Sequence, residues 1–134
     1  MNLHKNTTSI LAALALLLST PLALAGNDDS IKGIERLAIQ TAMGEHVQTN
    51  TLNTNYVIFD NQKGHLKKLT LEKLHDGIVR KGDFFVSCAD FRDSSGKLYD
   101  LDFLVAKQGD NYRVLQALVH AVEGNKRPYH LESL

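Results

Sequence analysis

Three apolar runs separated by two short polar turns occupy residues 83–122 and constrain the fold more than any other part of the chain. The runs read DFFVSCADFRD, KLYDLDFLVAK and NYRVLQALVHAV, and each turn contains a glycine. The central run alternates with a period of two, which is typical of a half-buried strand. The residues on its apolar side are Tyr99, Leu101, Phe103 and Val105. The two residues at 109–110 (Gly-Asp) are a typical hairpin turn, so this stretch predicts an antiparallel meander.

Residues 1–25 have the pattern of a secretory signal peptide. Lys5 gives a positive start, and the apolar run at 10–18 (ILAALALLL) is shorter than the about 20 residues that span a bilayer. The sequence ALA at 23–25 fits the small-x-small rule, so cleavage is expected after Ala25. An uncleaved anchor is disfavoured because Pro21 interrupts the run. We therefore expect a periplasmic or secreted protein with a bacterial-type leader, and no integral membrane segment after cleavage.

The remaining residues, 26–134, are enough for a single domain with one core. The full chain carries 15 basic and 15 acidic residues, and this balance disfavours nucleic-acid binding through phosphate neutralisation. Cys88 is the only cysteine, so packing rather than an internal disulfide must stabilise the fold. An intermolecular disulfide at Cys88, and with it a homodimer, is an alternative.

The pattern of elements predicts an α+β fold in which an N-terminal helix packs on a curved four- to five-stranded antiparallel meander. Residues 28–48 carry acidic N-terminal residues and an apolar stripe that includes Ile31 and Ile34, as an amphipathic helix does. A polar loop follows at 49–55, and strands are expected at 56–59 and 66–79. Within the second of these strands, Asp76 and Gly77 predict a bulge. The tail at 124–134 is expected to be irregular.

This order of elements resembles the cystatin-like and NTF2-like folds, in which a curved sheet wraps an N-terminal helix. The resemblance covers most of residues 26–134 and rests on topology, without a family motif. It implies no particular residue roles, because proteins of that group include binding modules, inhibitors and enzymes.

The lengths of the turns predict which side chains face one another. Two-residue turns at 81–82 and 109–110 and a four-residue loop at 93–96 set the register of the strands. In this register Cys88 faces both His75 and Leu101, while Tyr99 lies between Asp90 and His120. All are expected on the face that the helix covers. The candidate ligand-binding residues are therefore His75, Cys88, Asp90, Tyr99 and His120.

The same residues have simpler structural interpretations. A cysteine in a strand most often behaves as a small buried apolar group, and His120 fits a hydrogen-bonded histidine at the edge of the core. Asp100 and Asp102 are expected on the solvated face of their strand. No histidine falls in a recognised metal-binding spacing such as HExxH, and Cys88 is not part of a CxxCH haem motif.

We therefore expect a small exported binding module that holds a small molecule or a protein partner in a helix–sheet cleft. The sequence favours a non-enzymatic role over an enzymatic one. One alternative is an enzyme with Cys88 as nucleophile, His75 or His120 as base and Asp90 as the residue that orients the base. A second alternative is a transition-metal or haem binder through His75 and His120. The sequence does not identify a cofactor.

Overall fold

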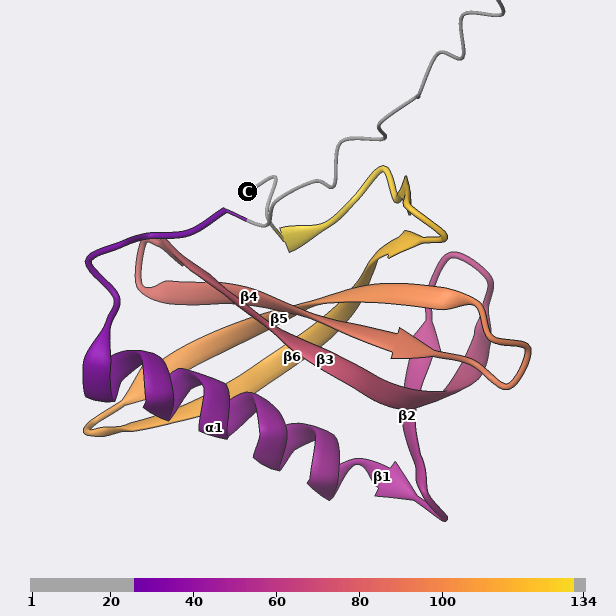
Figure 1. Cartoon of the computed structure of the whole chain (residues 1–134), viewed down its shortest axis with the longest axis horizontal. Helices are drawn as coiled ribbons and strands as arrows, with labels where there is room; N and C mark the ends of the chain where they lie inside the picture. Colours follow the sequence, from indigo (N-terminus) through magenta and orange to yellow (C-terminus); the bar gives the residue numbers. More distant parts are fainter. Residues whose placement is uncertain (1–25, 132–134) are drawn as a thin grey trace, which may run out of the picture.

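The computed structural model describes residues 26–131, which form one helix and a seven-stranded antiparallel sheet (Figure 1). The strands lie in the sheet in the same order as in the chain. The elements are α1 (Gly33–Thr49), β1 (Thr51–Leu52), β2 (Asn55–Asp60), β3 (His65–Lys81), β4 (Phe84–Arg92), β5 (Leu98–Gln108), β6 (Asn111–Val122) and β7 (Asn125–Lys126). The α+β class is as predicted, but the expected four or five strands are seven. The two extra strands, β1 and β7, have two residues each and are too short to show a period.

The predicted signal peptide, residues 1–25, lies outside the described residues. Within residues 26–131, no helix has the length and apolar content that a membrane span requires.

The core lies between α1 and one face of the sheet. Figure 1 shows the helix lying along this face. Ile39 and Met43 of the helix are fully buried, as are Leu101 and Phe103 of β5. Burying each of these side chains contributes about 1.5–3 kcal/mol. The alternation in the central run therefore has the predicted role, because it presents apolar side chains to the helix.

The helix begins at Gly33, later than the predicted start at residue 28. The Asp28 carboxylate accepts hydrogen bonds from the backbone N–H and the hydroxyl of Ser30, which makes a turn of these residues rather than a helix cap. Ile34 was expected in the buried stripe, but 86% of it is exposed. The apolar stripe of α1 is accordingly shorter than the sequence pattern indicates.

Two of the three predicted turn positions are wrong by one residue. The turn at 109–110 is confirmed, because Gln108 pairs with Asn111. The preceding hairpins differ: Lys81 pairs with Phe84, which places the turn at 82–83, and the next loop spans 93–97. Gly82 has a φ of +60°. A tight hairpin turn needs a positive φ at its first central residue, which explains why the glycine takes that position rather than the second.

Two long strands are bulged. In β3 the register shifts between Leu74 and Ile78, so the predicted bulge at Asp76 and Gly77 is present. In β6 one shift leaves His120 between the paired residues Val119 and Ala121. Bulges bend a strand and redirect the side chain of the extra residue.

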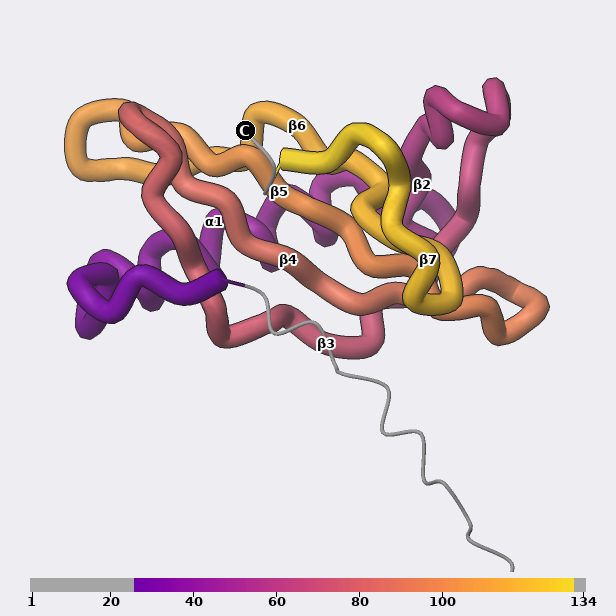
Figure 2. The backbone as a smooth tube through the Cα atoms, turned by 90° about the horizontal axis from the view of Figure 1, so that it is seen from above, coloured from indigo at the N-terminus to yellow at the C-terminus, as the bar shows by residue number. Residues whose placement is uncertain are grey.

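The sheet face opposite α1 is covered by chain from both ends of the described region. Figures 1 and 2 show the segment after β7 crossing over this face. We call residues 127–131 the C-terminal strap. Arg127 Nη2 lies 2.8 Å from Asp60 Oδ2, and the backbone N–H of Leu131 donates to Asp102 over 2.8 Å. At the other end of the chain, the N–H of Asp28 donates to the carbonyl of Ile78. Helix, sheet and strap thus form three layers.

Candidate metal centre

Cys88 and Asp90 lie on the face of the sheet that the strap covers. Cys88 pairs with Asp102 across β4 and β5, and Asp90 pairs with Asp100. Because paired side chains project to the same side of a sheet, these four point away from α1. The predicted pairings, Cys88 with Leu101 and Asp90 with Tyr99, are wrong. The loop at 93–97 is one residue longer than expected, and a slip of one residue moves every side chain of a strand to the opposite face.

Tyr99 does not belong to this group of residues. It pairs with Phe91 and Val122, is 4% exposed, and is part of the core on the helix side of the sheet. The predicted row Asp90–Tyr99–His120 is therefore not formed. The other predicted site residues do converge, but on the face opposite the one expected.

The bulge in β6 brings His120 into the cluster. Its Nδ1 lies 2.8 Å from Asp102 Oδ1 and 3.7 Å from Asp100 Oδ2, and only 3% of the residue is exposed. The His130 ring, from the strap, stacks on the His120 ring with centroids 4.3 Å apart and planes 8° apart. The bulge and the strap together therefore decide the surroundings of His120.

Asp102 is the most deeply buried member, with 0% of its surface exposed. Its Oδ1 accepts hydrogen bonds from Cys88 Sγ, 3.0 Å away, and from His120. Its Oδ2 accepts the N–H of Leu131. The expectation of a solvated face is wrong for Asp102, because the strap covers it, and Asp100 is half-buried, with 26% of its side chain exposed. The polar sequence of residues 125–130 (NKRPYH) carries no signal of such a cover, and sequence reasoning missed His130 for the same reason.

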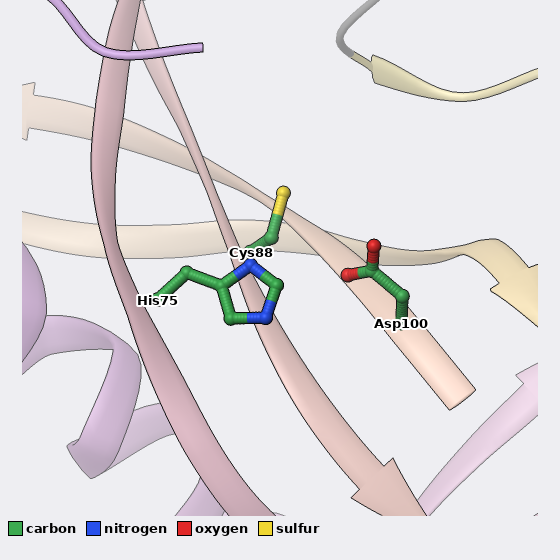
Figure 3. A group of neighbouring side chains, drawn as sticks. All are labelled: His75, Cys88 and Asp100. Atoms are coloured by element: carbon green, nitrogen blue, oxygen red, sulfur yellow. The ribbon is translucent and has the colours of Figure 1, made fainter. Parts of the chain in front are cut away.

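A second part of the cluster lies beside the β3 bulge. His75 Nε2 is 3.0 Å from Asp90 Oδ1. Figure 3 shows His75, Cys88 and Asp100 rising from three neighbouring strands on the same side of the sheet. Burial raises the pKa of Asp100 to about 6, and the charges of Asp90 and Asp102 act in the same direction, while His120 and His75 oppose them. Among the described residues, Asp100 Oδ1 is buried without a hydrogen-bond partner.

Two groups of potential ligands share Cys88. One contains His75, Cys88 and Asp100, and the other contains Cys88, Asp102 and His120; within each group the ligand atoms lie within 4.8 Å of one another. Ligands about 2.0–2.3 Å from one ion can be at most about 4.6 Å apart, so small side-chain movements would bring each group to coordination distance. Thiolate, imidazole and carboxylate are the ligands that zinc and related transition metals take in proteins.

The geometry is less suited to a cysteine nucleophile. Cys88 is 1% exposed, and its Sγ donates to a carboxylate. Reactive cysteines occupy partly exposed, electropositive surroundings, because the thiolate is the nucleophile. Here the neighbouring carboxylates oppose a thiolate unless a cation is also present.

The interface between α1 and the sheet is filled by the core, and two hollows lie at its margins. One, of about 440 Å³, lies between α1 and the turn that joins β5 to β6. The other, of about 290 Å³, is lined by His46, Tyr56 and parts of β2 and β6. Burial lowers the pKa of His46 and raises that of Tyr56, whose hydroxyl lies 3.1 Å from His46 Nε2. Neither hollow is lined by a predicted site residue.

The chain matches no model of a known protein family, no curated protein and no solved structure.

Proposed function

We propose that this chain is a small exported binding domain whose ligand is a transition-metal ion, held on the strap-covered face of the sheet. The observation that carries the proposal is the convergence of Cys88, Asp102 and His120 in one buried group. These residues come from three strands and supply three different ligand types. Such a donor set favours zinc or a neighbouring first-row metal over calcium or magnesium, which prefer oxygen ligands alone.

The charges of the site support the proposal. Asp102 is fully buried and Asp100 has a buried carboxylate oxygen without a hydrogen-bond partner among the described residues. Buried anionic groups are costly unless they are paired or coordinate a metal. A bound cation would offset this charge and would give Asp100 Oδ1 a partner.

The test is metal binding by the purified chain. The protein is loaded with Zn²⁺ or Co²⁺, dialysed, and its metal content measured by elemental mass spectrometry. We expect Cys88→Ser, Asp102→Asn and His120→Ala each to lower the affinity by at least about 10–100-fold, the range that even supporting residues of metal sites show. In the Co²⁺ form, a sulfur-to-cobalt charge-transfer band is expected to disappear in Cys88→Ser.

His65→Ala is the matched control, because His65 is an exposed histidine on β3 at a distance in the chain from the cluster. It should bind metal as the unmodified chain does. Circular dichroism shows whether each variant is folded, and Cys88→Ala replaces Cys88→Ser if the latter is not. An unmodified chain that binds no metal, or a folded Cys88 variant with unchanged affinity, would contradict the proposal.

A further inference from the structure

We infer that the centre holds two metal ions per chain, bridged by the Cys88 thiolate; this rests on the proposed function. The two groups of ligands have Cys88 as their single common member. His75 and Asp100 complete one group, and Asp102 and His120 complete the other. A thiolate sulfur has enough lone pairs to bind two ions at once. Cys88 lies on β4, between β3, which carries His75, and β5, which carries Asp100 and Asp102, so one sulfur is placed close to both groups.

The number of potential ligands fits two ions better than one. Two ions with about four ligands each that share one thiolate need about seven ligand atoms. On the β3 side, Asp90 Oδ1 lies 3.0 Å from His75 Nε2. On the β6 side, His130 Nδ1 lies 3.9 Å from Asp102 Oδ2. The seven residues of the cluster are His75, Cys88, Asp90, Asp100, Asp102, His120 and His130.

The balance of charge agrees with this count. The carboxylates of Asp90, Asp100 and Asp102 and the Cys88 thiolate together carry four negative charges. Two divalent ions neutralise them, whereas one leaves two negative charges in a site where Cys88, Asp102 and His120 are buried and the other members are half-buried. Uncompensated charge in such a place is strongly unfavourable, so a single ion would leave the site still able to attract a second. On binding, the thiol proton is released to solvent, and no other bond is made or broken.

The experiment measures stoichiometry, by calorimetric titration with Zn²⁺ and by metal analysis after dialysis. We expect two ions per chain, and about one ion per chain in Asp100→Asn and in His120→Ala, which each damage one half of the centre. Cys88→Ser should lower the affinity of the chain for both ions at least tenfold, since it removes the ligand that they share. His75→Ala is a second variant of the group that contains Asp100, and it should also bind about one ion per chain. The control, His65→Ala, should retain two ions.

Electron paramagnetic resonance of the Co²⁺ form tests the bridge itself. A thiolate between two Co²⁺ ions couples their spins, so the signal per cobalt should fall as the second equivalent binds and recover in Asp100→Asn. One ion per chain in the unmodified protein, or two ions whose signals simply add, would overturn the two-ion centre and leave the proposed function intact. If no ion is bound, both proposals are wrong.

Discussion

Each side of the sheet has one polar side chain with a central role, the fully buried Asp102 on the strap side and the half-buried His46 on the helix side. Asp102 is a carboxylate with no exposed surface, and it accepts hydrogen bonds from Cys88, His120 and Leu131. Leaving a buried donor without its acceptor costs about 1–3 kcal/mol, so these contacts hold the cluster together even without a metal. On the helix side, His46 is the corresponding polar residue, with its ring in edge contact with Phe103 and its Nε2 beside the Tyr56 hydroxyl.

His46 makes stability depend on pH. Burial lowers its pKa from the ordinary value of 6.5, so protonation favours the unfolded chain. The contribution of neutral His46 is present above the unfolded pKa and is lost as pH falls below about 6.5 towards the folded pKa. The measurement is the free energy of unfolding in urea at about pH 7.5 and at about pH 5. We expect this free energy to fall less between the two pH values in His46→Gln than in the unmodified chain, because glutamine does not titrate there.

His65→Gln is the control for this comparison, since His65 is exposed. Its pH profile should match that of the unmodified chain. A His46→Gln profile as steep as that of the control would contradict the assigned role of His46.

The elements that shape the centre are the bulges and the strap. The bulge in β3 contains His75 and the bulge in β6 contains His120, so the irregular positions of both strands carry potential ligands. The strap is fixed at one end by Arg127 on Asp60 and at the other by Leu131 on Asp102. Between these anchors lies His130. The strap therefore adds a potential ligand to the proposed metal centre as well as covering it.

Removal of the first anchor tests this view of the strap. Asp60 is 1% exposed, and Arg127→Ala would leave its carboxylate buried without the guanidinium partner. We expect a loss of about 3 kcal/mol in the free energy of unfolding, measured in urea, together with weaker metal binding as His130 is released.

Arg113→Ala, at an exposed position of β6, is the matched control and should change stability by no more than about 0.5 kcal/mol. The double variant Asp60→Asn/Arg127→Ala should recover part of the loss, because it no longer buries an uncompensated charge. An effect of Arg127→Ala no larger than that of Arg113→Ala would show that the strap is not held by this ion pair.

At the scale of the whole molecule, the potential ligands connect β3, β4, β5, β6 and the strap. Global unfolding would separate all of them, so the proposed metal binding would be coupled to folding. A ligand at 100 times its Kd that binds only the folded state stabilises it by about 2.7 kcal/mol.

We expect Zn²⁺ at 100 times its Kd to raise Tm by roughly 10–20 °C, given that a domain of this size shifts by about 4–8 °C per kcal/mol. The measurement is differential scanning calorimetry with and without Zn²⁺, and a chelator should reverse the shift. Cys88→Ser should show little shift. A Tm that does not respond to Zn²⁺, Co²⁺ or Cu²⁺ would argue against a centre that links the strands.

Several parts of this structure could be predicted from residues near one another in the chain. The alternation around Leu101 and Phe103 predicted a strand that buries these apolar side chains, and the glycine at 109 predicted its hairpin. The bulge at Asp76 and Gly77 was also predicted. These features depend on local backbone preferences and on a period of two, both of which a single sequence displays.

The sequence by itself thus determined that Cys88, Asp102 and His120 lie on consecutive strands of an antiparallel meander. Only the tertiary structure decided which face they occupy, which partners they have and what covers them. One residue more in the loop at 93–97 reverses the faces of β4 relative to β5, and the bulge at His120 redirects an imidazole that a regular strand would place elsewhere. The strap lies over Asp102 through contacts between residues far apart in the chain, and such contacts leave no periodic trace in the sequence.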